Sequence, residues 1–169
     1  MRKGSNDASG SGKEKKPGQW YVDPIPVIYP KYPYKIKEEA GKDYILDEFR
    51  KKWLLLTPEE WVRQNFIRYL ADNKKCPPPY IVIERQIVTG ERTSRFDIVV
   101  YGRDAKPWML VECKNMNINI SKNHVQQILR YHRAAPAKYL VITNGLFTWC
   151  YMKAETGFEP VMYIPEYEE

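Results

Sequence analysis

The sequence predicts an α/β domain in which a mixed central β-sheet is flanked by helices. Two observations lead to this fold class. An amphipathic helix pattern precedes three β-rich segments, and a second helix pattern precedes two more, so the predicted order is αβββαββ. With 169 residues, 43% of them hydrophobic, the chain has the size of one globular domain with a tail.

Three segments are expected along the chain. Residues 1–19 are rich in Gly, Ser and Lys and almost lack apolar side chains, so they should form a disordered basic tail. Residues 20–42 begin with a stretch dense in proline and aromatic residues and should form an extended arm laid against the domain. Residues 43–169 should form the domain itself, with 44–53 as either a short strand or a turn.

The first helix is expected to begin after Thr57. This threonine suits the N-cap, Pro58 suits the first helical position, and Glu60 stands where a capping box carries a glutamate. One apolar face then recurs at helical spacing, formed by Val62, Phe66, Tyr69 and Leu70. A cysteine and three prolines at 76–79 should end the helix.

Five strands are expected, over residues 80–88, 95–101, 108–114, 138–143 and 146–152. Between the third and fourth, Ser121 suits the N-cap of a second helix that runs to about Arg133. Asn144 and Gly145 form a hairpin signal, which predicts that the last two strands pair with each other.

Three charged residues interrupt the apolar sequence of the second and third strands: Asp97, Glu112 and Lys114. Side chains alternate along a strand, so Glu112 and Lys114 should share one face, with Cα atoms about 6.6 Å apart. Asp97 can reach that face from the neighbouring strand, about 4.8 Å away. Two carboxylates can hold a divalent cation for phosphodiester cleavage while a lysine stabilises phosphoryl charge. The alternative is structural, with Glu112 and Lys114 as an ion pair and Asp97 capping a turn.

Composition restricts the metal, the partners and the location. Three widely spaced cysteines and only two histidines, His124 and His132, argue against a disulfide framework or a zinc site. A metal here should be a hard cation such as Mg²⁺ or Mn²⁺, and both histidines should be packing or surface residues. The net charge of +6 suits a polyanionic partner, although five basic and two acidic residues within 1–19 supply +3 of it. No apolar run reaches the length of a membrane span and no signal peptide is evident, so a cytoplasmic location is expected.

The spacing of the charged residues resembles the signature of the PD-(D/E)xK nuclease superfamily: Asp97, fourteen intervening residues, then Glu112-x-Lys114. More narrowly, five stretches resemble the N-terminal nuclease domain of type I restriction enzyme R subunits, namely TPEEWVRQ, RFDIVVYGRDAKPW, LVECKN, QILRY and YLVITNG. The resemblance covers roughly residues 49–151. It implies a restriction-endonuclease-like core, in which Asp97 and Glu112 are metal ligands, the backbone carbonyl of Cys113 is a third, and Lys114 is the catalytic lysine.

Both helices offer further site residues by the same resemblance. Family members often carry another acidic residue near the start of the first helix; Glu59, on the face toward the sheet, is favoured over Glu60, which suits the capping box. Gln127 and Tyr131 are spaced like a pair that lies beside the active site in exonucleases of the superfamily. The alternative for that pair is a polar helix flank with a half-buried tyrosine.

The expected function is metal-dependent hydrolysis of phosphodiester bonds in DNA, with RNA left open as a substrate. The alternative is a non-catalytic nucleic-acid-binding or scaffold module that keeps the nuclease fold. The chain has no GxxxxGK[ST] phosphate loop, so we expect no motor domain within it and consider a separate motor or specificity protein as a partner. Dimerisation through the arm, over residues 20–34, is compatible with either function.

Overall fold

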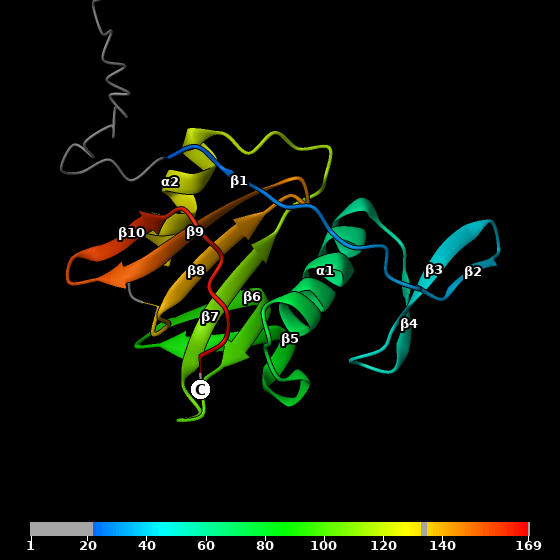
Figure 1. Cartoon of the computed structure of the whole chain (residues 1–169), viewed down its shortest axis with the longest axis horizontal. Coiled ribbons are helices and arrows are strands. Elements are labelled where there is room, and N and C mark those ends of the chain that lie inside the picture. The colour runs from blue at the N-terminus through cyan, green and yellow to red at the C-terminus, as the bar shows by residue number, and fades with distance from the viewer. Residues whose placement is uncertain (1–21, 133–134, 169) are drawn as a thin grey trace, which may run out of the picture.

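The computed structural model describes residues 22–132 and 135–168 (Figure 1). This part of the chain contains a seven-stranded sheet, a separate three-stranded sheet, and the α-helices α1 (Pro58–Arg68) and α2 (Lys122–Tyr131). The predicted α/β class with a mixed central sheet is therefore confirmed. The tail expected over 1–19 lies outside the described residues. Among the described residues, no helix is long and apolar enough to cross a membrane.

The central sheet has the strand order β1-β9-β8-β7-β6-β5, with β10 paired to β9. Its strands are β1 (Ile25–Pro26), β5 (Ile81–Thr89), β6 (Arg92–Tyr101), β7 (Pro107–Cys113), β8 (Tyr139–Thr143), β9 (Phe147–Ala154) and β10 (Gly157–Val161). β7 and β8 are parallel, with α2 in the crossover between them, and the other pairs are antiparallel. From α1 onward the order is αβββαβββ rather than the predicted αβββαββ. The additional strand β10 contains Gly157 and Pro160, which weaken a strand signal in the sequence.

The two helices cover opposite faces of the central sheet (Figure 1). On β7, Met109 and Val111 pack into the core beneath α1, together with Phe66 of that helix. Leu110 points the other way, into the core beneath α2 that contains Val125. β7 is thus a central strand with a core on each face, and the charged segment of the predicted site follows at its end.

α1 begins as the sequence predicts. The Thr57 hydroxyl accepts a hydrogen bond from the backbone N–H of Glu60 at 3.1 Å, and Pro58 lies in the first turn. The Glu60 carboxylate is buried, where it accepts hydrogen bonds from Gln64 at 2.8 Å and from Arg50 at 3.1 Å. Glu60 therefore joins the helix to the segment before it, a contact that a capping box alone would not provide.

A small N-terminal sheet precedes α1, and in space α1 lies between this sheet and the central sheet (Figure 1). It consists of β2 (Ile36–Glu39), β3 (Lys42–Asp47) and β4 (Lys52–Leu55). β2 lies within the range expected to be an extended arm, and it pairs with β3 across the expected boundary at residue 43. The turn between them consists of Ala40 and Gly41, with φ values of 53° and 72°, so only its second residue is a usual turn signal. Residues 22–35 of the expected arm contain no helix, and their short strand β1 pairs with β9.

Candidate active site

Strand β6 changes the direction of its side chains at Asp97. Phe96 packs in the core beneath α2 and Ile98 in the core beneath α1, although residues two apart on a regular strand share a face. On β5, Ile83 pairs with Ile98 and Arg85 pairs with Phe96, which leaves Glu84 opposite Asp97. Glu84 has a φ of 55°, which is uncommon for a residue other than glycine. The β6–β7 pairing also ends here, with Ile98 and Val111 as its last partners. The two strands therefore part beside Asp97.

The Asp97 carboxylate lies where β6 and β7 part. Its Oδ2 accepts a hydrogen bond from the backbone N–H of Cys113 at 2.7 Å, and its Oδ1 accepts one from Nη2 of Arg63 at 2.8 Å. A side-chain oxygen thus binds a β7 N–H group that the strand pairing leaves free. This contact fixes Asp97 beside the residue that separates Glu112 from Lys114.

Arg63 of α1 is the residue that sequence reasoning missed. Its side chain is only 9% exposed and contacts the carboxylates of Asp97 and Glu60, with that of Glu59 at 3.4 Å. Burial disfavours the charged guanidinium, but the Asp97 and Glu60 carboxylates outweigh burial and raise the pKa of Arg63. The only sequence signal was helical spacing, since Arg63 follows Glu60 and Glu59 by three and four residues.

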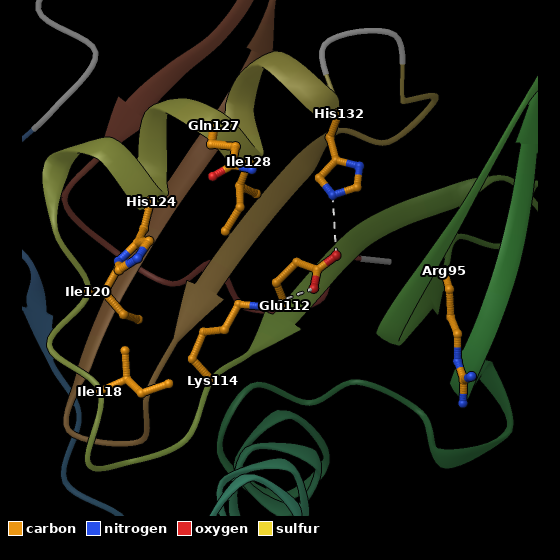
Figure 2. Close-up of a pocket in the computed structure, with 9 residues that line it drawn as sticks. All are labelled: Arg95, Glu112, Lys114, Ile118, Ile120, His124, Gln127, Ile128 and His132. Atoms are coloured by element: carbon orange, nitrogen blue, oxygen red, sulfur yellow. Dashed lines mark ion pairs between the residues drawn. The ribbon is translucent and has the colours of Figure 1, made fainter.

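Glu112 and Lys114 extend from the end of β7 on the side of α2 (Figure 2). Nζ of Lys114 is 3.9 Å from Oε2 of Glu112, and Nε2 of His132 is 3.2 Å from Oε1. His132 is buried at the C-cap of α2, and its ring centroid lies 4.5 Å from that of Phe96. The expectation of a packing role for His132 is met, but the ring also contacts the Glu112 carboxylate.

A cavity of about 610 Å³ lies between α2, the loop that follows β7 and the end of β7 itself (Figure 2). It is lined by Arg95, Glu112, Lys114, Ile118, Ile120, His124, Gln127, Ile128 and His132. Gln127, which helical spacing singled out, therefore borders the same cavity as Glu112 and Lys114. The side chain of its expected partner Tyr131 lies outside the described part of the structure.

The acidic residues are divided between the two sides of the end of β7. Glu112 borders the cavity, whereas Asp97 and Glu59 contact Arg63 on the side of α1. Between them, the thiol of Cys113 is buried; burial raises its pKa well above the ordinary value, and the charges of Asp97 and Glu112 raise it further. Cys113 therefore lies between Asp97, which binds its backbone N–H, and Glu112, its neighbour in sequence.

The donor set decides which metal this strand end could hold. Within residues 22–132 and 135–168, no three His, Cys, Asp or Glu side chains form a cluster able to hold a metal ion. Asp97 and Glu112 are hard oxygen donors, and Mg²⁺ commonly binds through one or two carboxylates together with waters and substrate phosphates. Oxygen donors of this kind suit Mg²⁺ or Mn²⁺ better than zinc, which in protein sites is mostly held by cysteine and histidine. The thiol of Cys113 packs in the core, which leaves its backbone carbonyl as the ligand that the resemblance implies.

Comparison with known proteins gives a family match. Residues 58–165 match the model of a family described as the type I restriction enzyme R protein N terminus. A search of curated proteins finds no match to the chain. The matched segment contains α1, α2 and strands β5 to β10, and it begins after the N-terminal sheet.

Proposed function

We propose a function from one established premise: the chain belongs to the family of type I restriction enzyme R protein N-terminal domains. Membership supports a nuclease-like role and an interaction with DNA. On this premise the chain has a restriction-endonuclease-like core that hydrolyses phosphodiester bonds in DNA with the help of Mg²⁺ or Mn²⁺.

One observation supports this function most directly: Asp97 binds the backbone N–H group between Glu112 and Lys114. This contact ties Asp97 of β6 to the segment of β7 that carries Glu112 and Lys114, although the Asp97 side chain itself lies on the side of α1. In a purely structural ion pair, the Lys114 ammonium group would be expected to lie in close, buried contact with the Glu112 carboxylate, because an unpaired buried charge costs several kcal/mol. Here the Lys114 side chain stays 38% exposed and borders a cavity, so its ammonium group remains accessible to a phosphate.

The proposed roles follow from chemistry and position. Asp97 and Glu112 would hold the metal ion, with the backbone carbonyl of Cys113 as a further ligand. The bound ion would polarise the phosphate and lower the pKa of a bound water. Lys114 would bind a phosphoryl oxygen and stabilise the negative charge that develops on it, since an ammonium group forms strong charge-assisted hydrogen bonds with phosphate.

Two residues of the helices would support this site. Glu59 lies 3.4 Å from Arg63, which binds Asp97, so Glu59 would act on the metal through water rather than as a direct ligand. Gln127 borders the cavity opposite the strand end, and its amide could donate to and accept from a bound nucleotide.

A second candidate function is a non-catalytic nucleic-acid-binding or scaffold module. The observation that favours it is the state of the two carboxylates. Asp97 already binds Arg63, and Glu112 already contacts His132. A module that never binds metal would keep these contacts permanently, whereas a nuclease must share both carboxylates with an ion.

Incubation with supercoiled plasmid, linear duplex, single-stranded DNA and RNA, each with Mg²⁺, Mn²⁺ or EDTA, tests the proposal. Asp97→Asn preserves the size of the side chain and should lower cleavage by at least about a hundredfold. Asp104→Asn is the control, because Asp104 lies in the exposed β6–β7 turn and binds the N–H of Lys106. Binding without cleavage under every condition would favour the module instead.

Partners of the nuclease are also proposals. Cleavage of both strands of a duplex needs either two active sites or two successive cleavage events at one site. A homodimer would supply two active sites. A separate motor or specificity protein would bring the nuclease to its target. The sedimentation coefficient of the chain, alone and with DNA, distinguishes a monomer from a dimer.

A further inference from the structure

The cavity beside Glu112 and Lys114 is larger and less polar than a phosphate group requires. At about 610 Å³ it falls in the size range of sites for whole small ligands, roughly 300–1,000 Å³. One wall is formed by three isoleucines, Ile118, Ile120 and Ile128. A phosphodiester has no apolar surface to place against such a wall, so the wall requires a different part of the substrate.

The loop after β7 holds this wall in place. Ile120 is 3% exposed and anchors the loop in the core beneath α2. Ile118 is 43% exposed, yet its backbone is held: its N–H donates to the carbonyl of Asn115 at 2.9 Å, and its carbonyl accepts from Asn144 at 3.0 Å. The Ile118 side chain is therefore an apolar group presented to the cavity on a fixed backbone (Figure 2).

Polar groups surround the isoleucines in an order that fits a nucleotide. Glu112 and Lys114 lie at the strand end, where the phosphodiester would be bound, and Gln127 and His124 project from α2 at the other side (Figure 2). Of the isoleucines, Ile128 lies beside Gln127 on α2, Ile120 lies below His124, and Ile118 lies at the lower left near Lys114 (Figure 2). A phosphate at Lys114 would thus leave the attached base beside an apolar wall, with amide and imidazole groups near its polar edge.

We propose that this cavity binds the base of an unpaired nucleotide next to the phosphodiester held at Glu112 and Lys114, an inference that rests on the proposed function. In a duplex, the apolar faces of the bases are stacked and only sugars, phosphates and base edges are accessible. An unpaired nucleotide exposes the face of its base, and a base that leaves the stack can be held in a pocket between aromatic or apolar side chains. The substrate class is therefore single-stranded DNA, or duplex ends and junctions with unpaired bases.

A matched pair of variants in one loop tests the proposal. Ile118→Gln replaces an isoleucine that lines the cavity, and Met116→Gln replaces a residue of similar exposure, 36%, that does not line it. Both positions are exposed, so both variants should keep the melting temperature of the original chain. The probes are fluorescein-labelled oligothymidylate and a blunt duplex of equal length, each measured by anisotropy in EDTA and in Ca²⁺.

The single strand should bind roughly tenfold more tightly than the duplex, and Ile118→Gln should remove about tenfold of that affinity, as expected for loss of one buried aliphatic contact. Met116→Gln should leave the affinity unchanged. Equal loss in both variants, or equal affinity for single strand and duplex, would overturn the proposal.

A second readout locates the base directly. An oligonucleotide that carries 2-aminopurine should change its fluorescence on binding to the original chain and to Met116→Gln, and much less on binding to Ile118→Gln. An unchanged signal in all three would mean that the base stays in solvent, and would contradict the proposal. Because these measurements need no cleavage, a failure of the nuclease function alone would leave them intact.

Discussion

Arg63 and Asp97 form a largely buried ion pair in which Nη2 of the arginine lies 2.8 Å from Oδ1 of the aspartate. The pair continues through Glu60, which binds both Arg63 and Arg50, to Asp47 in the N-terminal sheet. Each carboxylate in this chain of contacts has at least one guanidinium partner, which offsets the cost of removing the charges from water. Asp97 is thus linked, through Arg63 and Glu60 of α1, to Arg50 and Asp47 before that helix.

Arg63→Met should lower the free energy of unfolding by about 3 kcal/mol, because it leaves the Asp97 and Glu60 carboxylates without their common partner in a buried setting. Urea unfolding followed by circular dichroism measures the change. Lys75→Met is the control: Lys75 and Glu166 form an ion pair with both side chains exposed, so its loss should cost less than about 1 kcal/mol. Equal effects would contradict the importance assigned to burial.

Asp47 should make stability depend on acid pH. Burial opposes ionisation of Asp47, but hydrogen bonds from the backbone and side chain of Arg50 and from Gln64 outweigh it, so the pKa lies below the ordinary value of 3.8. The stabilisation is fully present above the unfolded pKa and is lost as the pH falls through the folded pKa. Asp47→Asn should therefore be less stable than the original chain at neutral pH, by about 2 kcal/mol, with a gap that narrows below about pH 4.

Urea unfolding of both proteins at a series of pH values checks this expectation. Asp104→Asn, at an exposed turn position, should show no such narrowing. If the difference in free energy of unfolding between Asp47→Asn and the original chain stays constant over the whole pH range, the charge of the Asp47 carboxylate does not contribute to stability.

The three cysteines should be inert toward thiol reagents in the folded protein. All are buried, and burial raises the pKa of both Cys76 and Cys150 to about 12, and that of Cys113 well above its ordinary value. At pH 8 the thiolate fraction of Cys76 or Cys150 should be about a thousandfold below that of an unperturbed thiol. Titration with a thiol-reactive disulfide should detect no rapid reaction in the native state and three thiols in denaturant; one fast native thiol would contradict the burial.

Gly145→Ala should destabilise the protein more than the same change at another turn. Gly145 has a φ of 88°, and an added Cβ would lie 3.0 Å from Cγ2 of Val62. Gly41 has a φ of 72° with open space around it, so Gly41→Ala would report the backbone cost alone. We expect losses of about 2 kcal/mol for Gly145→Ala and about 1 kcal/mol for Gly41→Ala, from thermal unfolding. Similar losses of stability for the two variants would show that the Val62 side chain moves away from the added methyl group without a measurable free-energy cost.

The features that the sequence predicts correctly are those that depend on a few neighbouring residues. The cap at Thr57 and the hairpin turn at Asn144 and Gly145 depend on a few neighbouring residues, and the structure contains both. The N-terminal sheet is less visible, because its strands are short and rich in lysine and glutamate, and they are ordered through contacts of Asp47 with Gln64 of α1.

The same distinction applies to the candidate site. Strand alternation correctly puts Glu112 and Lys114 on one face, since both border the cavity. Alternation does not reveal the reversal at Asp97, which arises where β6 and β7 part, or the approach of Arg63 from a helix 34 residues earlier. These features depend on tertiary contacts, and whether the gathered residues hold metal and cleave DNA stays a prediction.

The N-terminal sheet also bears on how this protein is best divided for expression. A fragment that starts at Pro58 would keep the whole family match, yet it would omit Asp47 and Arg50. Glu60 would then face solvent on one side with Arg63 as its remaining arginine partner among those described. We therefore expect a fragment that starts at Pro58 to be less stable than one that begins before β2 and keeps these contacts.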